Sequence, residues 1–328
     1  MKRRDVIKLF GAAILSKPVA GSAENAQKKF RVGLFNRGVP VSDTSPYGQA
    51  LIRGLQARGY VLGRNLEFER RGAGGRFDLL PGLLDELVAS KVDVIVAIGY
   101  PAAVTAKTHA TVPVVSWSTG DPVGTGLVDS LARPGGHVTG ISDMALELSP
   151  KRIQLLKELV PNLSRIAIIW NTADAGMVLR YKMSDDAART LGMTIMPFGV
   201  REPQDIDRAF DAMIRDKPDA IIVIAEALTI GNRRRIFDFA SAGRLPILYD
   251  ENGFLVHDGG LMFYGPDDDE SFDRIAALVD RILKGSKPAD LPFEQPTRFR
   301  FVVNARTAKS LGLTIPTSIL LRADEVIE

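Results

Sequence analysis

Cysteine is absent from this chain of 328 residues, and only three histidines are present. Without cysteine the chain can form no disulfide, thiolate nucleophile, cysteine-ligated zinc site or lipoprotein anchor. The histidines, His109, His137 and His257, are scattered, and none has a partner at the spacing that metal ligands require. The sequence therefore predicts neither a metal site nor a cofactor.

Enzyme signatures and long hydrophobic runs are also absent. The sequence contains no G-x-S-x-G nucleophile elbow and no phosphate-binding P-loop. Two glycine-rich segments, 72–77 and 124–129, lack the third glycine of a dinucleotide-binding fingerprint. No segment approaches the roughly 20 apolar residues of a membrane-spanning helix. These absences favour a protein that is not an enzyme and has no transmembrane helix.

Positive charge is concentrated at the N-terminus. Residues 1–23, MKRRDVIKLFGAAILSKPVAGSA, hold five basic residues and one acidic residue, so the formal charge of +3 leaves −1 for the rest of the chain. A near-neutral body gives no electrostatic reason to expect a nucleic-acid partner. Paired arginines, a short apolar run and small residues, in that order, indicate a twin-arginine-like signal peptide with cleavage after Ala23. The alternative is the basic start of an amphipathic helix; we expect export and a periplasmic location.

A weak internal repeat organises the rest of the chain. Short β-branched runs alternate with helical patterns from residue 30 onward, which is typical of βαβ units and parallel sheets. Three strand-like segments recur in the same order in the second half: 30–38 with 164–172, 91–103 with 217–229, and 111–121 with 244–253. The sequence therefore predicts an α/β protein with two doubly wound parallel-sheet lobes.

Helical segments with apolar residues at i, i+3 and i+4 lie between these strands. They cover 45–58, 76–90, 150–159, 174–191, 203–215 and 231–242. Pro150, after Ser149, is predicted to start a helix, and Gly192 to follow a helix end. The glycine-rich segment 133–142 is predicted to be a crossover between the lobes.

The C-terminal part is predicted to return to the first lobe through a multi-strand hinge. Residues 259–265 are predicted to be a strand, 267–285 a helix with an acidic start, and 298–313 a strand followed by a helix. We expect an N-terminal lobe of 30–140 plus about 266–298 and a C-terminal lobe of 141–265 plus about 299–328. The three aspartates at 267–269 are expected to be exposed acids on a first helical turn rather than a metal site.

Polar residues gather where the predicted strands end. Ligands of open α/β sheets bind outside the carboxyl ends of the strands, and two facing lobes would bring both sets of residues to one cleft. The candidate ligand-binding residues are Asn36, Arg37, Tyr100, Ser118 and Thr119 in the first lobe and Asn171, Thr172, Glu226, Tyr249 and Asp250 in the second. Simpler roles stay open for several of them: Asn36 and Asn171 as caps, and Tyr249 as a core residue. Trp117 is equally open to a packing role.

The chemistry of these candidates suits a small polar or zwitterionic solute. Arg37 and the amides of a helix start, such as the one at Pro101, could hold a carboxylate. Glu226 or Asp250 could meet an amine, and Tyr100 and Tyr249 could face a ring or a cation. An aromatic amino acid is one solute of this kind.

Several long motifs carry a resemblance to a known family. They include GRFDLLPGLLDELV (75–88), GDPVGTGLVDSLARPGGHVTGIS (120–142), KRIQLLKELVP (151–161) and the terminal block from ILKGSKPADLPFEQPTRFRFVVNARTAKSLGL onward (282–313). With these motifs the chain resembles the ABC transporter substrate-binding proteins of the tryptophan/tyrosine type over nearly its whole length. The resemblance implies a fold like that of class I periplasmic binding proteins, with a solute trapped between two hinged lobes. It also implies delivery of that solute to a membrane permease.

The leading interpretation is an extracytoplasmic solute-binding protein of an ABC importer, acting as a monomer with permease subunits as partners. Solute binding to both lobes would shift an open ensemble toward a closed one. A ligand-sensing module for a receptor kinase is the first alternative, because the same lobes would serve it. An α/β enzyme that uses the cleft for chemistry is the second, and the missing motifs count against it.

Overall fold

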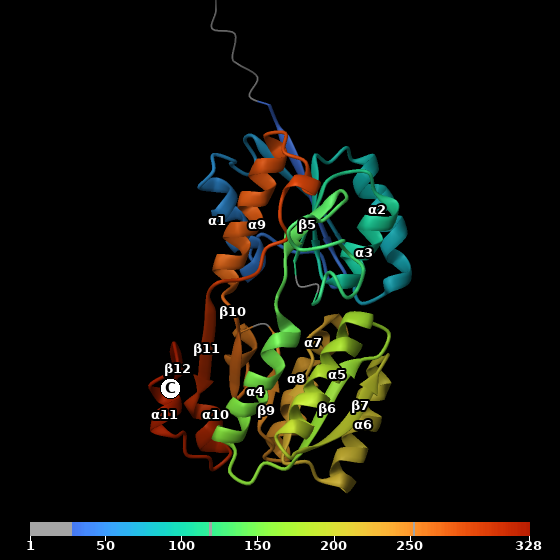
Figure 1. The fold of residues 1–328 in the computed structure, drawn as a ribbon. Helices are drawn as coiled ribbons and strands as arrows, with labels where there is room; N and C mark the ends of the chain where they lie inside the picture. The colour runs from blue at the N-terminus through green and yellow to red at the C-terminus, as the bar shows by residue number, and fades with distance from the viewer. Residues whose placement is uncertain (1–27, 118–119, 252) are drawn as a thin grey trace, which may run out of the picture.

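The computed structural model describes residues 28–117, 120–251 and 253–328, which form two lobes, each built on its own β-sheet (Figure 1). The first sheet has five parallel strands in the order β2-β1-β3-β4-β5. These strands are β1 (Phe30–Asn36), β2 (Leu66–Gly72), β3 (Val94–Ile98), β4 (Val114–Trp117) and β5 (Val138–Ile141). The residues of β3, β4 and β5 are all buried, as expected for a parallel sheet covered on both faces, whereas the edge strand β2 is mostly half-buried.

Helices cover both faces of the first sheet. Helices α1 (Pro46–Gln56) and α9 (Asp268–Leu283) pack side by side on one face, where Leu51, Leu55 and Ile275 join the core (Figure 1). Helices α2 (Leu80–Ala89) and α3 (Tyr100–His109) form the opposite core, and a 3-10 turn, η1 (Phe77–Leu79), precedes α2. The first lobe therefore depends on a helix that lies 127 residues beyond the end of β5, at Asp268.

The second sheet has seven strands in the order β12-β11-β10-β9-β8-β6-β7. They are β6 (Arg165–Asn171), β7 (Thr194–Val200), β8 (Ala220–Val223), β9 (Ile247–Tyr249), β10 (Met262–Pro266), β11 (Phe299–Asn304) and β12 (Glu325–Ile327). Only the β10–β11 pair is antiparallel among the strand pairs of the described residues. The order β1-β3-β4 in the first sheet is matched by β6-β8-β9 in the second, as the sequence repeat predicts.

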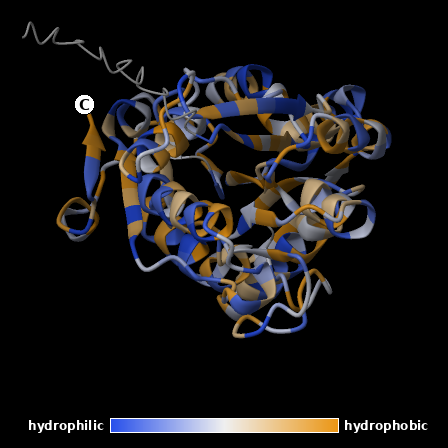
Figure 2. Ribbon diagram, turned by 90° about the horizontal axis from the view of Figure 1, so that it is seen from above, coloured by the Kyte–Doolittle hydropathy of each residue, from blue (hydrophilic) through white to orange (hydrophobic). Residues whose placement is uncertain are grey.

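The helices of the second lobe also form two layers. Helices α4 (Ala145–Leu159) and α5 (Ala175–Thr190) share one core with α10 (Ala305–Ser310) and α11 (Thr317–Leu320). Helices α6 (Pro203–Asp216) and α8 (Arg233–Ala242) form the other, while α7 (Ala227–Gly231) and η2 (Gly253–Val256) are short connections. The 3-10 turn η3 (Pro288–Asp290) packs against β5 in the first lobe. Surface helices carry hydrophobic and hydrophilic residues in turn along their length, as amphipathic helices do (Figure 2).

Three segments of the chain cross between the lobes, and backbone hydrogen bonds hold them to adjacent segments. The first follows β5, and the amide of Ser142 there donates to the carbonyl of Glu294 over 2.9 Å. The second joins β10 to α9, and the third runs into β11; the amide of Asp267 donates to the carbonyl of Arg298 over 3.0 Å. These bonds tie the crossings into one hinge region.

One predicted helix start is wrong. The sequence placed Pro150 at the start of a helix, whereas α4 begins at Ala145 and holds Pro150 inside. The carboxylate of Asp143 accepts a hydrogen bond from the amide of Ala145 over 3.1 Å, and Ala145 and Leu148 are buried. Burial in this added turn, together with the hydrogen bond from Ala145 to Asp143, outweighs the preference of proline for a first helical position. Within the described ranges, none of the helices is long and apolar enough to cross a membrane.

Candidate functional site

The carboxyl ends of strands from both sheets meet between the lobes. Arg37, just after β1, reaches Asp174, at the start of α5 in the second lobe, with 2.8 Å between Nη1 and Oδ2. The other terminal nitrogen of Arg37 donates to the carbonyl of Ala225, after β8, over 3.3 Å. The lobes are therefore in direct contact where these strands end.

Two helix starts approach each other on the same side of the cleft. Tyr100 begins α3 and Gly176 lies in the first turn of α5; a Cβ atom on Gly176 would stand 3.4 Å from the Cβ of Tyr100. The Tyr100 hydroxyl donates to the carbonyl of Thr125 over 3.3 Å. Burial and the nearby carboxylate of Asp174 raise the pKa of Tyr100 above its ordinary value. No side chain caps α3, whereas Ser45, Asp174 and Glu226 cap α1, α5 and α7.

Four aromatic rings form a cluster near the hinge. Tyr47, in the first turn of α1, stacks on Phe272 of α9 with ring centroids 5.1 Å apart and meets Trp117 edge-on at 4.9 Å. Phe254 approaches from the second lobe, with its centroid 6.5 Å from that of Tyr47. Burial, Asp268 and Glu251 raise the pKa of Tyr47, while Arg37 lowers it. Aromatic surface and charges of both signs therefore meet at one place between the lobes.

A buried charge cluster lies beside these rings. Arg180 of α5 is 1% exposed and donates to three carboxylates: Asp143 in the first crossing, Asp250 at 3.3 Å and Glu251 at 2.7 Å. Asp250 also accepts a hydrogen bond from the amide of Ala225 over 2.7 Å. The cluster joins the hinge to the residues at the end of β9.

The acids in and beside the cluster differ in the direction of their pKa shifts. Burial raises the pKa of Asp143 to about 7, because Arg180 only partly offsets the desolvation and Glu251 adds repulsion. Burial also opposes the charge on Glu251, but Arg180 and a hydrogen bond with Asp143 outweigh it and hold the pKa of Glu251 well below its ordinary value. Asp268, at the start of α9, has its pKa raised to about 7 by burial and by its acidic neighbours, with Glu251 first among them.

The structure brings some of the predicted residues of the first lobe to the cleft. Arg37 and Tyr100 lie at the contact between the lobes, as described above. Asn36 shapes its own turn: its amide donates to the carbonyl of Val39 over 2.8 Å and its oxygen accepts from the amide of Gly38. Ser118 and Thr119 lie outside the described residues.

Asn171 and Glu226 of the second lobe lie together at the cleft. The Asn171 amide donates to Glu226 over 3.3 Å, and Glu226 is fully buried and caps α7 through the amide of Thr229. The Thr172 hydroxyl instead accepts a hydrogen bond from the exposed side chain of Arg201 over 2.9 Å. Asn171 and Glu226 thus stabilise the turn after β6 and the start of α7, whereas Thr172 lies toward the outer edge of the sheet.

Tyr249 and Asp250 are the remaining predicted ligand-binding residues of the second lobe. Tyr249 is 2% exposed and packs on Phe237 in the core beneath α6 and α8, with Arg233 and Asp258 as its charged neighbours. The structure thus places Tyr249 in the core, the simpler role that the sequence left open, on the face of the sheet that α6 and α8 cover. Asp250 belongs to the Arg180 cluster.

Sequence reasoning missed Tyr47, Asp143, Asp174, Arg180 and Asp268. Asp174 precedes a helical pattern, so a helix-cap signal could have located it. Arg180 had no such signal, since a charged residue within an amphipathic helix usually faces solvent. Asp268 was expected to be exposed with its neighbours, but only Asp269, which pairs with Arg53 at 2.5 Å, is strongly exposed.

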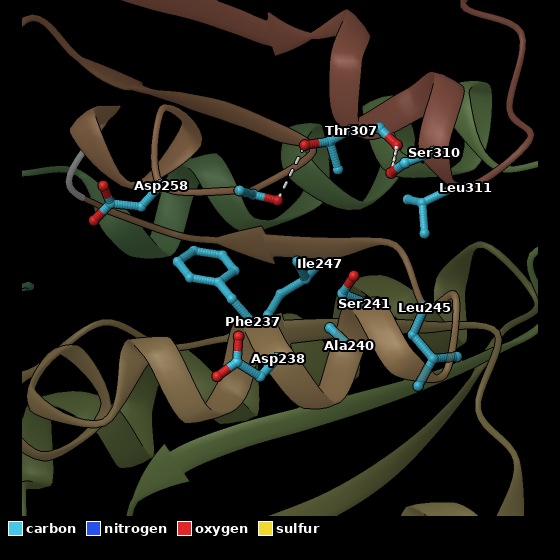
Figure 3. A pocket seen from close by; sticks show the side chains of 11 residues that line it. Phe237, Asp238, Ala240, Ser241, Leu245, Ile247, Asp258, Thr307, Ser310 and Leu311 are labelled. Atoms are coloured by element: carbon cyan, nitrogen blue, oxygen red, sulfur yellow. Dashed lines mark hydrogen bonds between the residues drawn. The ribbon is translucent and has the colours of Figure 1, made fainter.

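A separate pocket lies on the second lobe, away from the cleft. Its volume is about 240 Å³, and it opens between α8 and α10, with Phe237, Ser241, Asp258 and Thr307 among its lining residues (Figure 3). The Thr307 hydroxyl donates to the carbonyl of Gly259, which closes one side of the pocket. Across the described part of the chain, no group of His, Asp and Glu side chains has the arrangement of a metal site.

Comparison with known proteins gives a consistent assignment. A tyrosine-binding protein from Clostridioides difficile (strain R20291) is 27% identical over 267 residues, which cover 81% of this chain and 76% of that protein. A conserved domain protein from Vibrio cholerae has a crystal structure with 27% identity and a TM-score of 0.83, covering 91% of this chain and 100% of that one. An ABC domain from Streptococcus pneumonia in complex with L-Trp shows 25% identity and a TM-score of 0.80, covering 92% and 100%.

The predicted fold class, two doubly wound lobes of the class I periplasmic-binding-protein kind, is confirmed by the sheet topology and by solved solute-binding proteins with the same fold. The family model described as ABC transporter substrate binding protein matches residues 41–327. This match spans both lobes and all three crossings between them. The chain belongs to the ABC transporter substrate binding protein family.

Proposed function

We propose that this substrate-binding protein traps an aromatic α-amino acid between its lobes and releases it unchanged to an ABC permease. The observation that carries the proposal is the position of Tyr47. Its ring joins Trp117, Phe254 and Phe272, and it lies in the field of Asp268, Glu251 and Arg37. A solute with a ring, an ammonium and a carboxylate complements such a place.

The acids near Tyr47 favour the ammonium end of the solute. The carboxyl of Asp268 has no ion-pair or hydrogen-bond partner among the described residues. Glu251 lies close enough to raise the pKa of this carboxyl by like-charge repulsion. An ammonium bound there would stabilise the ionised form of Asp268.

Hydrogen-bond donors for the carboxylate of the solute are also available, and another donor lies beside the aromatic cluster. The first amides of α3 have no side-chain cap, so they can bind a carboxylate as helix starts commonly do. The indole nitrogen of Trp117 is buried and has no hydrogen-bond partner among the described residues. Two relatives support the class of solute, since one is named a tyrosine-binding protein and one was solved with L-Trp.

Calorimetric titration of the mature protein tests the proposal. L-Trp, L-Tyr and L-Phe are compared with tryptamine, which lacks the carboxylate, and with indole-3-propionate, which lacks the ammonium. We expect binding of at least one amino acid and loss of most affinity for both analogues, because each leaves a buried charged or polar group unpaired. Binding of sugars or polyamines without any aromatic amino acid would contradict the proposal.

We further propose export through the twin-arginine-like segment and action as a monomer in the periplasm. The support is the sequence of residues 1–23 and the family, whose members serve membrane transporters. Mass spectrometry of the protein recovered from a periplasmic fraction should show an N-terminus at Glu24. Replacement of Arg3 and Arg4 by lysine should retain the precursor in the cytoplasm, and normal export of that variant would argue against this route.

A further inference from the structure

One buried ion pair joins the two lobes directly. Arg37 follows β1 of the first sheet, and Asp174 follows β6 of the second, so the two residues belong to separate lobes. Their side chains are 8% and 0% exposed, and 2.8 Å separates Nη1 from Oδ2. Because the pair bridges two bodies joined by a hinge, it forms only when the cleft closes.

Both partners are held in place by their own lobe. A Cβ atom on Gly99 would stand 3.0 Å from Cδ of Arg37, so the arginine lies flat on the backbone at the end of β3. The second oxygen of Asp174 accepts from the amide of Gly176 over 2.9 Å and caps α5. Each charge thus has contacts within its own lobe, and such contacts reduce the entropy lost on pairing.

We propose that Arg37 and Asp174 form a closure latch, which stabilises the closed cleft and raises solute affinity through the closed-to-open ratio rather than by contact with the solute. This inference rests on the proposed function for its effect on affinity, but the latch itself concerns the lobes alone. The guanidinium that the sequence assigned to the solute carboxylate is bound instead to Asp174 and to the carbonyl of Ala225.

The latch has a characteristic energetic signature. Removing one partner leaves the other charge buried without its counter-ion in the closed form, which is far costlier than removing both. Each single substitution should therefore shift the lobes toward the open form. The double substitution should shift the lobes toward the open form no more than either single substitution, because it leaves no unpaired charge buried.

The first experiment measures the distance between the lobes without any solute. The chain has no cysteine, so Asp85→Cys on α2 and Gln204→Cys on α6 provide two unique, exposed positions for spin labels. We expect a short-distance population in the parent protein that is lost in Arg37→Met and in Asp174→Asn and regained in the double variant. Asparagine keeps the cap of α5, so Asp174→Asn tests the charge and not the fold.

The second experiment measures the dissociation constant of the best-binding aromatic amino acid in the same variants. Each single variant should bind roughly 10-fold or more weakly, as expected when the competent closed state becomes rarer. Asp258→Asn is the matched control, because the Arg233–Asp258 pair lies within the second lobe and is unchanged by closure.

Two results would overturn the latch: unchanged distance distributions in both single variants, or losses of affinity that simply add in the double variant. The distance measurement needs no solute, so it keeps this outcome separate from a failure of the proposed function. If no amino acid binds at all, the proposed function fails and the latch is still judged by the distances.

Discussion

Arg180 and Glu251, both in the second lobe, form a buried ion pair with 2.7 Å between Nη2 and Oε1. The same guanidinium serves Asp143 in the hinge and Asp250 after β9. One cation therefore holds three carboxylates from two separate segments, and both segments end at the cleft.

Replacement of Arg180 by methionine should destabilise the protein strongly. The substitution removes the guanidinium that pairs with three buried acids, which costs about 3–5 kcal/mol of the free energy of unfolding. Urea unfolding measures the change. Arg189→Met is the control on the same helix, because its side chain is 73% exposed and its pair with Asp185 is worth less than about 1 kcal/mol. Equal losses in the two variants would show that the cluster contributes no more than a surface pair.

Asp268→Asn should change how stability depends on pH. The folded protein keeps the carboxyl protonated up to a pKa of about 7, whereas the unfolded chain releases that proton near 3.8. The native state therefore binds more protons between these values, and the stability linked to this group falls as the pH rises from about 4 to about 7. The asparagine variant lacks this loss, so its stability relative to the parent should rise across that window.

The charged groups that surround Asp268 are Glu251, Asp267, Asp269 and Arg300, and Tyr47 lies close by. Thermal unfolding at pH 4, 6 and 8 measures the effect. Asp269→Asn removes an exposed charge from the same turn and is the control. A parent and an Asp268→Asn variant with parallel stability curves would contradict a raised pKa at this position.

Tryptophan fluorescence should report solute binding through one residue alone. The chain has two tryptophans. Trp117 lies in the ring cluster near the cleft, whereas Trp170 stacks on Tyr181 in the core of the second lobe, with ring centroids 3.8 Å apart. The spectral change on adding L-Tyr or L-Phe should survive in Trp170→Phe and vanish in Trp117→Phe. A change that disappears only with Trp170 would place the solute elsewhere.

Gly99→Ala should weaken solute binding without a direct contact. Gly99 has φ of +86°, which L-residues rarely adopt, and an added Cβ would press on the Arg37 side chain at 3.0 Å. We expect a loss of stability of about 1 kcal/mol or more and a weaker dissociation constant. Gly82→Ala in α2 is the matched control, since nothing lies within 4 Å of its added Cβ and alanine favours the helix. Equal stability and equal solute affinity in the two variants would contradict the idea that Gly99 positions the Arg37 side chain.

The repeated strand pattern of the sequence predicted the fold well for a physical reason. Buried parallel strands such as β3 and β8 are continuous apolar runs, and their order follows from right-handed βαβ crossovers. The start of α4 was missed because it depends on the burial of Ala145 and Leu148, which is a matter of tertiary packing.

The candidate site was harder to predict than the fold. Strand ends are visible in a sequence, and they led to Arg37 and Asp250. Which partner each side chain takes is a matter of three-dimensional approach: Arg37 meets Asp174 from the other lobe, 137 residues away in the chain. The same limit applies to Tyr47 and Phe254, which no local pattern joins.

The three crossings also affect how the chain folds during synthesis. Helix α9 covers one face of the first sheet, so Leu51 and Leu55 lack their partners until residues 268–283 have left the ribosome. By then the central strands of the second lobe, up to Tyr249, have already been made, while β11 and β12 are still missing. Neither lobe can be finished before the other is nearly complete, and a nascent chain that stops early leaves apolar surface open on both sheets.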